Sequence, residues 1–315
     1  MLDVTTIGEG QLRLTSGIGQ PLSQAATLEV YVAGTEANVA GLLSRLGRKV
    51  GLVTALPDNP LGRRIVEEFR AAGIRVDHVV LQSSGRVALY FVEENPPPLP
   101  SRVLYDRAGS VFSQVLPDQI DFDYLASSRL LHLTGITAAL TDTTRGLLST
   151  ALLRAATEGQ KVSFDINFRH NLWSPAAARD WLEANITSKI AVLSCARRDA
   201  EALYGVGGDA RDVPARLADR FGAPTVLVSD GAGPVHCYHD GATYTQAPHP
   251  TAVIDRVGAG DALLGGFLHG YLDGDLERGL RLGVAAAALT LARRGEQLRT
   301  TEAELEAFCG GDIQR

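Results

Sequence analysis

The stretch IDRVGAGDALLGGFLHG, residues 254–270, begins with a glycine-rich turn and continues in a helical pattern. Apolar residues follow the turn in the spacing of a buried helix face, at Leu263, Leu264, Phe267, Leu268, Tyr271 and Leu272. The spacing predicts a buried helix that begins at the turn and ends near Gly274. We expect a second helix, rich in alanine, from residue 276 to residue 294.

The turn itself predicts an anion site. The small residues Gly258, Ala259 and Gly260 let backbone N–H groups approach an anion, and a helix N-terminus adds about half a positive charge. Asp261, in the first turn, is placed to remove a proton from a substrate hydroxyl, which is the base that phosphoryl transfer needs. A tight strand–helix turn capped by an aspartate explains the same four residues equally well.

Short β-rich runs alternate with helical patterns along most of the chain, which predicts an α/β fold with a mostly parallel sheet covered by helices on both faces. The expected strands are Val4–Ile7, Lys49–Thr54, Leu130–Thr134, Lys161–Asp165, Ile190–Leu193, Thr225–Ser229 and Val235–Tyr238. The expected helices between them include Asn38–Leu46, Leu61–Ala72, Thr143–Glu158 and Ala176–Ala184. Ligands bind such sheets beyond the carboxyl ends of the strands.

Two stretches interrupt the alternation. Residues 10–34 have no helical period, and residues 85–112 contain two strands, Val87–Glu93 and Ser101–Arg107, joined by the proline-rich EENPPPLP. We expect residues 10–34 and 85–112 to form a small β lid on a main domain made of residues 1–9, 35–84 and 113–315.

Composition excludes several classes of protein. The 315 residues carry 30 Lys and Arg against 36 Asp and Glu, a formal charge of −6, so we expect no nucleic-acid partner. The three cysteines, Cys195, Cys237 and Cys309, are far apart, which argues against disulfides or zinc and for a reducing cytoplasm. No apolar stretch approaches ~18 residues, so we expect no membrane span.

Four further motifs place polar residues where strands end or helices begin. FDINFRHNLW (164–173) sends Asp165, Asn167 and Arg169 beyond a strand, and AGTEANVA (33–40) places Gly34 and Asn38 at a helix entry. VLYDRAGS (103–110) carries Tyr105 and Arg107 on one face of the second hairpin strand, and Tyr90 lies on the first strand. VLVSDGAGPV (226–235) is a strand with a glycine-rich turn. Each alone also fits an ordinary loop, helix entry, surface arginine or hairpin.

Together, the five motifs resemble, in order and spacing, the ribokinase-like family of ATP-dependent sugar kinases (the phosphofructokinase-B type). The resemblance covers nearly the whole chain. AGTEANVA, Tyr90, VLYDRAGS, HLTGITAAL and FDINFRHNLW are similar to the 2-keto-3-deoxygluconate kinases of that family. The resemblance implies a three-layer α/β/α fold with a β lid, and phosphorylation of the terminal hydroxyl of a keto-deoxy sugar acid, with ATP and Mg²⁺ as cofactors.

The resemblance also implies roles for individual residues. Asp261 matches the catalytic base, and Gly258, Ala259 and Gly260 match the anion hole for the γ-phosphate. Residues that match sugar contacts are Gly34, Asn38, Tyr90 and Tyr105, together with Arg107 and Arg169 as the clamp on the sugar-acid carboxylate. Residues that match the nucleotide and phosphate side are Asn167, Ser229, Gly231 and Gly233.

The chain departs from the family pattern at the metal-linked positions. Arg256 stands where Thr is frequent in the signature, which leaves a monovalent-cation requirement open although Asp255 matches the position of that loop. The usual Asn-x-x-Glu of the Mg²⁺ water network is Ala196–Arg197–Arg198–Asp199, so Asp199 and Asp255 are weak candidates for metal ligands. Ser229–Asp230–Gly231 replaces a common Thr-Leu-Gly, and Asp106 replaces a second lid tyrosine.

Other functions remain open alternatives. No GxGxxG follows the first strand to open a helix, and no GxxxxGK[ST] occurs, so a dinucleotide oxidoreductase and a P-loop NTPase are not supported. A sugar-binding relative without turnover, or a kinase for fructose, ribose or 5-dehydro-2-deoxygluconate, remains the alternative. Exposed lid strands leave an edge that a second copy of the chain could cover, so we expect a homo-oligomer.

Overall fold

The centre of the protein is an eight-stranded sheet with the strand order β14-β13-β12-β11-β10-β9-β1-β4. A computed structural model describes residues 1–96, 98–187 and 189–311. The strands of this sheet are β1 (Leu2–Ile7), β4 (Val50–Val53), β9 (Ser128–Thr134), β10 (Lys161–Asp165), β11 (Val192–Ala196), β12 (Thr225–Ser229), β13 (Val235–His239) and β14 (Ala242–Gln246). The strands from β4 to β12 in this order run parallel, and β13 and β14 form an antiparallel edge.

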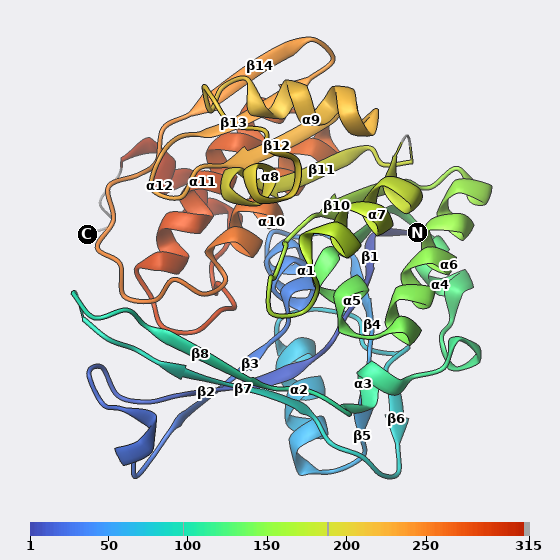
Figure 1. Cartoon of the computed structure of the whole chain (residues 1–315), viewed down its shortest axis with the longest axis vertical. Helices are drawn as coiled ribbons and strands as arrows, with labels where there is room; N and C mark the ends of the chain where they lie inside the picture. Colours follow the sequence, from blue (N-terminus) through green and yellow to red (C-terminus); the bar gives the residue numbers. More distant parts are fainter. Residues whose placement is uncertain (97, 188, 312–315) are drawn as a thin grey trace.

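Helices cover both faces of the sheet, which makes the fold a three-layer sandwich (Figure 1). The helices are α1 (Thr35–Arg45), α2 (Pro60–Ala71), α3 (Val111–Gln114), α4 (Phe122–Ala126), α5 (Gly135–Leu140), α6 (Asp142–Glu158), α7 (Pro175–Ile186), α8 (Arg197–Tyr204), α9 (Val213–Phe221), α10 (Ala259–Asp273), α11 (Leu276–Leu291) and α12 (Glu302–Gly310), with short 3-10 turns at Leu22–Gln24 and Pro117–Gln119. Side chains alternate across each strand, so Leu130 packs toward α1, α2, α10 and α11, while Leu131 packs toward the helices from α3 to α9.

A second, smaller sheet stands beside the main one, with the order β3-β2-β7-β8 (Figure 1). Its strands are β2 (Gln11–Thr15), β3 (Glu29–Ala33), β7 (Ala88–Glu93) and β8 (Arg102–Asp106). It is mixed, because β2 pairs with β7 in parallel while the outer pairs are antiparallel. Tyr31, Arg13, Tyr90 and Tyr105 are paired across it, so these four side chains share one face.

The predicted fold class is confirmed, and all seven expected strands of the main sheet are present. Several boundaries differ from the expected ones; for example, the helix expected from Asn38 begins at Thr35. The strand expected at Ile190–Leu193 runs instead from Val192 to Ala196. The helix expected to reach residue 294 ends at Leu291, because the backbone N–H groups of Ile254 and Asp255 take the carbonyl of Leu291.

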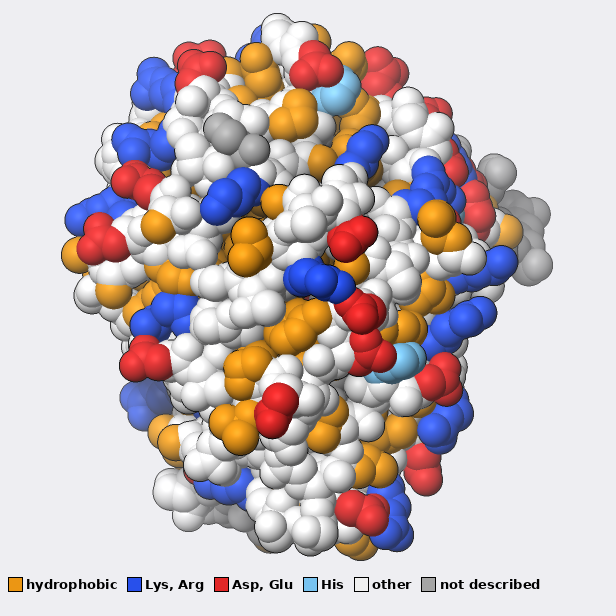
Figure 2. Space-filling view, turned by 90° about the vertical axis from the view of Figure 1, so that its right-hand side faces the viewer, with side chains coloured by type: hydrophobic (Ala, Val, Ile, Leu, Met, Phe, Trp, Pro, Cys, Tyr) orange, Lys and Arg blue, Asp and Glu red, His pale blue; other side chains and the backbone are white. Residues whose placement is uncertain are grey.

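The sequence also gave no signal for several elements. The edge strand β14 and the two-stranded parallel sheet of β5 (Ala55–Pro57) and β6 (Val80–Gln82) were not expected. Among the described residues, no helix has the length and apolar character needed to cross a membrane. On the face of the molecule that carries α4 and α6, cationic and anionic side chains are interspersed (Figure 2).

Candidate active site

The helices α1 and α10 begin close together, and their first turns meet through side chains. The Asn38 amide Nδ2 donates to Asp261 Oδ2 at 2.7 Å, although the two residues are 223 positions apart. Gly34 is the N-cap of α1, with φ of +155°, and a methyl group there would lie 2.7 Å from the carbonyl oxygen of Glu9. The structure therefore joins the AGTEANVA and GAGD motifs in one site, as the sequence predicts.

The N-terminus of α10 is an open cradle for an anion. No side chain caps this 15-residue helix, so its first N–H groups lack the partner that a capping residue gives. Gly258 has φ of +87°, and a methyl group on it would lie 2.6 Å from the carbonyl oxygen of Glu296. A methyl group on Gly260 would meet no atom within 4 Å. The cradle is thus supported by Glu296 on one side and open on the other.

Asp261 has the electrostatic character of a base. Burial raises the pKa of its carboxyl to about 8, against the lowering effect of the Asn38 hydrogen bond, and the nearby carboxyl of Asp165 raises it further. The nearby Arg169 guanidinium acts in the opposite direction on the pKa. Asp261 stays half-buried rather than sealed off, so a substrate hydroxyl can reach it. A carboxylate that holds a proton this tightly is suited to accept one near neutral pH.

The end of β10 brings a cation to the same site. Burial raises the pKa of Asp165 to about 7, and Asn167 Nδ2 donates to its Oδ2 at 3.0 Å. Asn167 has φ of +38°, a left-handed conformation that non-glycine residues rarely adopt outside turns and functional sites. Arg169 has no ion pair among the described residues, and its Nε is buried without a hydrogen-bond partner. Arg169 is therefore available to an anionic ligand.

Arg107 approaches from the small sheet, but it already holds a carboxylate. Its Nε and Nη2 donate to Glu9 Oε2 at 2.9 and 2.6 Å, and Ser110 binds the other oxygen of Glu9. Arg107 Nη1 donates to no residue in the described part of the chain. The Arg107 guanidinium lies 5.7 Å from the Tyr105 ring, and the rings of Tyr105 and Tyr90 are 5.8 Å apart. Arg107, Tyr90 and Tyr105 thus form one group.

Two acidic residues beside these motifs, Glu9 and Glu36, were not among the predicted site residues. Glu9 anchors Arg107, and its side chain is 2% exposed. Glu36 accepts hydrogen bonds from Thr134 and Thr137, and burial raises its pKa. Only their position in the sequence could have indicated these two residues. Glu9 stands between two glycines in Gly8-Glu9-Gly10, and Glu36 stands inside AGTEANVA.

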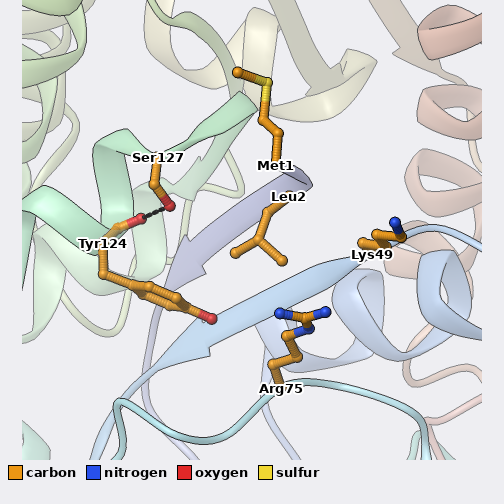
Figure 3. Close-up of a pocket in the computed structure, with 6 residues that line it drawn as sticks. All are labelled: Met1, Leu2, Lys49, Arg75, Tyr124 and Ser127. Carbon is orange, nitrogen blue, oxygen red and sulfur yellow. Dashed lines mark hydrogen bonds between the residues drawn. The ribbon is translucent and has the colours of Figure 1, made fainter.

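A cavity at the opposite edge of the sheet is a poorer candidate. It has a volume of about 270 Å³ and is lined by Met1, Leu2, Lys49, Arg75, Tyr124 and Ser127. It lies at the amino ends of β1 and β4, whereas α/β sheets bind ligands at the carboxyl ends. Figure 3 shows the Tyr124 hydroxyl directed toward the Arg75 guanidinium, while the Lys49 side chain points away from Arg75.

The comparisons with known proteins agree with this geometry. The family model described as pfkB family carbohydrate kinase matches residues 1–303. The chain belongs to the pfkB family of carbohydrate kinases. It is 36% identical over 312 residues to 2-dehydro-3-deoxygalactonokinase of Haloferax volcanii, with 98% of each chain covered. It is 34% identical to 2-dehydro-3-deoxygluconokinase of Thermoproteus tenax, over 94% of this chain and 90% of that one.

A solved structure gives the same picture. The crystal structure of 2-dehydro-3-deoxygluconokinase from Thermotoga maritima superposes with a TM-score of 0.92 at 27% identity, and covers 99% of this chain and 100% of that chain. The protein is thus an ATP-dependent sugar kinase, and the ribokinase-like fold expected from the sequence is confirmed.

The predicted nucleotide turn of the kinase follows β12. Ser229 ends β12 beside Ala196 at the end of β11, so it reaches the same edge of the sheet as Asp165. Gly231 has φ of +59°, and Asp230 accepts from Arg197 at 2.7 Å. No hydrogen bond among the described residues joins this turn, which includes Gly233, to α10. The roles of Ser229, Gly231 and Gly233 therefore stay predictions.

The two candidate metal ligands of the kinase differ. Asp199 lies in the first turn of α8, and burial raises its pKa. The negative charge of Asp199 also raises the pKa of Asp165. The two carboxyls therefore lie near each other. Mg²⁺ prefers one or two carboxylates together with substrate phosphates and water, so this pair fits an ion that enters with ATP.

Asp255 does not fit a metal site. Its Oδ1 accepts from the backbone N–H of Val257 at 3.0 Å, and its Oδ2 accepts from Arg13 at 2.7 Å and from the N–H of Gly295 at 3.2 Å. Both oxygens are occupied, so the proposal of Asp255 as a metal ligand is not supported. In the described residues, no group of three or more His, Cys, Asp or Glu side chains is arranged to hold a metal ion.

Proposed function

We propose that this kinase transfers the γ-phosphoryl group of ATP to the terminal hydroxyl of a 2-keto-3-deoxy sugar acid, with 2-keto-3-deoxygluconate as the first candidate. The observation that carries the proposal is Arg169, a cation near Asp261 that has no ion pair among the described residues and whose buried Nε has no hydrogen-bond partner. Arg107, beside Tyr105 of the small sheet, is the second cation. Its Nε and Nη2 bind Glu9, and its Nη1 donates to no residue in the described part of the chain. An acidic protein can bind an anionic sugar through two such cations.

Each group has a distinct part in the proposed reaction. Asp261 takes the proton of the terminal hydroxyl, and the oxygen forms a bond to the γ-phosphorus. The bond from that phosphorus to the bridging oxygen breaks, and its electron pair leaves with ADP. The N–H groups of the α10 cradle bind the oxygens of the transferring group. Asp165 and Asp199 are the residues that would hold Mg²⁺, which would neutralise charge on the phosphates.

We propose in addition that the small sheet, within residues 10–34 and 85–112, acts as a lid over the sugar. The buried Tyr90 hydroxyl has no hydrogen-bond partner, and it lies beside Tyr105. Sugar hydroxyls would supply the missing partner. Closure would exclude water and limit wasteful hydrolysis of ATP. The three free cysteines fit the reducing cytoplasm that we expect for such an enzyme.

A substrate panel tests the proposal. ADP release is measured by a coupled assay with 2-keto-3-deoxygluconate, 2-keto-3-deoxygalactonate, 5-dehydro-2-deoxygluconate, fructose and ribose. We expect kcat/KM for one of the first two acids to exceed that for fructose and ribose by at least ~100-fold, which corresponds to about 3 kcal/mol from the carboxylate contacts. Equal turnover of neutral sugars and acids would contradict the proposal, and no turnover at all would favour a sugar-binding protein.

The carboxylate clamp has its own test. Replacement of Arg107 by Ala is expected to raise KM for 2-keto-3-deoxygluconate at least ~10-fold more than KM for 3-deoxyfructose, in which a hydroxymethyl group replaces the carboxylate. The control is Arg86→Ala, because Arg86 is an exposed arginine that pairs with Asp106 at 2.8 Å. An equal change in KM for both sugars would exclude Arg107 as a carboxylate ligand.

A further inference from the structure

Arg13, in the middle of β2, is a long cationic side chain with no exposed surface. Its Nη1 donates to Asp255 Oδ2 at 2.7 Å, its Nη2 to Glu94 Oε1 at 3.0 Å, and its Nε to Thr15 Oγ1 at 2.8 Å. Glu94 directly follows β7 of the small sheet, while Asp255 belongs to the segment that leads into the α10 cradle. The guanidinium therefore bridges the two parts of the molecule.

The Asp255 side of this bridge holds the loop before the cradle. Asp255 accepts from the backbone N–H groups of Val257 and Gly295, which belong to the two loops that meet beneath Gly258. Gly258 in turn packs on the backbone of Glu296, where its conformation leaves room only for hydrogen. The position of the cradle thus depends on where the Asp255 carboxylate is held.

A second path leads from Arg13 to Asp261. Arg13 Nη1 lies 4.0 Å from Glu296 Oε1, and Glu296 Oε2 accepts from Asn38 Nδ2 at 3.1 Å. The same Asn38 nitrogen donates to Asp261 Oδ2 at 2.7 Å. Each link joins two side chains, and Arg13, Glu296 and Asn38 are all buried.

Charge balance makes Arg13 essential to this arrangement. It is the cation nearest to three buried carboxyls, those of Asp255, Glu94 and Glu296. Arg294 reaches Glu94 at 3.7 Å, but it belongs to the rim and also pairs with Glu29. Removal of one partner from a buried ion network leaves the others without compensation, which is more costly than loss of a surface pair. Without Arg13, the carboxyls would repel one another or take up protons, and Asp255 would lose its strongest anchor.

We propose that Arg13 is a positioning residue of the kinase, which fixes the phosphoryl cradle and Asp261 relative to the small sheet through Asp255, Glu94 and Glu296. Arg13 touches neither ATP nor sugar in this arrangement. It shares a face and a row with Tyr90 and Tyr105, so the sheet that contacts the sugar is rigidly connected to the loop that contacts the phosphate. The inference uses the sugar kinase activity and not the identity of the sugar acid.

The test compares Arg13→Met and Arg13→Lys with Arg48→Met. Arg48 is a matched control, since its side chain is only 13% exposed and pairs with Asp273 at 2.6 Å. Its partner Asp273 is the last residue of α10, 12 positions from Asp261. The readouts are kcat and KM with 2-keto-3-deoxygluconate, thermal unfolding, and hydrogen–deuterium exchange of the segment 254–262. The exchange measurement needs no substrate, so it remains informative if the proposed acid is wrong.

We expect Arg13→Met to lower kcat at least ~10-fold at a temperature well below its melting point, with KM for ATP changed less than ~3-fold. Exchange in the segment 254–262 should rise at least ~10-fold in Arg13→Met and stay unchanged in Arg48→Met. Arg13→Lys keeps the charge but not the fork of donors, and should recover part of both effects. If Arg13→Met does not fold, Arg13→Lys and Glu94→Gln carry the same comparison.

Two results would overturn the proposal. One is exchange of the segment 254–262 as slow in the Arg13 variants as in the parent protein. The other is a loss of kcat in Arg48→Met equal to that in Arg13→Met, which would show a general effect of lost stability.

Discussion

A single carboxyl group, that of Asp261, combines the demands of folding and catalysis. Burial raises its pKa from the ordinary value of 3.8 to about 8. The folded protein therefore holds this proton more tightly than the unfolded chain does. The contribution to stability is complete below pH ~3.8 and is lost as the pH rises to about 8. At alkaline pH, the protein carries a buried negative charge that destabilises the fold and that the proposed base chemistry requires.

Replacement of Asp261 by Asn should separate these effects. Asparagine cannot accept the proton of the hydroxyl, so kcat should fall at least ~10². It also cannot ionise, so the variant should melt a few degrees higher than the parent at pH 9, with a smaller difference at pH 5. Thermal unfolding at the two pH values and the ADP assay check this. Turnover close to that of the parent would remove Asp261 from the role of base.

The pH profile of kcat/KM gives a second prediction at this scale. If the ionised Asp261 carboxylate is the base, activity should rise with pH, with a midpoint near pH 8 and a plateau above it. The Asn38 hydrogen bond lowers the pKa of Asp261, so Asn38→Ala should move the midpoint to higher pH. Thr150→Ala on the exposed part of α6 is the control, since its hydroxyl bonds only the carbonyl of Gly146 among the described residues. A midpoint that stays in place would contradict the assignment.

Residue types in motifs could be predicted, but their partners could not. GAGD and AGTEANVA indicate a cradle, a base and a contact residue, and the Asn38–Asp261 hydrogen bond brings them together. Nothing local indicates that Arg107 binds Glu9, 98 residues away, or that Arg13 binds Asp255. The burial of Arg13 could not be predicted from the sequence. Arg13 stands between two leucines in QLRLT, and this alternation predicts a side chain that faces solvent.

At the scale of elements, the two ends of α10 differ. The N-terminus forms the proposed anion site, and the C-terminus is closed by a glycine cap. Its N-terminus is left without a capping side chain, and its C-terminus is closed by Gly274 at φ of +78°. The helix is buried along its length, so packing with α1 and α11 compensates for the missing cap. Packing in the core therefore offsets the stability that the uncapped N-terminus of α10 loses.

Two alanine substitutions on α10 should behave in opposite ways. Gly260→Ala meets no neighbour, so its melting temperature should stay unchanged or rise, but the methyl group lies where the phosphate is expected and kcat should fall at least ~10-fold. Gly274→Ala must adopt a left-handed conformation, so the protein should lose about 1 kcal/mol of stability with kcat unchanged. Loss of activity in Gly274→Ala alone would contradict this division.

Elements of the interior were predicted better than those at the edges. The buried parallel strands have continuous apolar runs, as in the Thr225–Ser229 strand. The edge strand β14 was missed because its sequence ATYTQ is polar and only half-buried. The helix α8 was missed because it spans only eight residues and begins with two arginines and an aspartate, which give little apolar periodicity.

At the scale of the whole molecule, the small sheet and its connections carry exposed apolar side chains. Leu104 on β8 is 61% exposed, as is Leu99 in the β7–β8 connection, and Ile18 after β2 is 57% exposed. A homo-oligomer that covers this surface is our proposal for the assembly. Leu104→Arg should then lower the mass measured by light scattering toward that of one chain.

The control for this prediction is Leu153→Arg on α6. Leu153 is 68% exposed, but it lies on the main body and away from the small sheet. Its substitution should leave the mass unchanged. A parent protein that is already monomeric at tens of micromolar would contradict the proposed assembly.

The bonds that complete the site join the two ends of the chain: Arg13 binds a residue 242 positions later, and Asn38 binds one 258 positions later. During synthesis, the first strands leave the ribosome long before their partners are made. A nascent chain that stops short of Glu296 contains the residues of the cradle but lacks the backbone on which Gly258 packs. Truncated products of this gene would therefore also lack the bond from Asn38 to Glu296, whatever part of their sheet has folded.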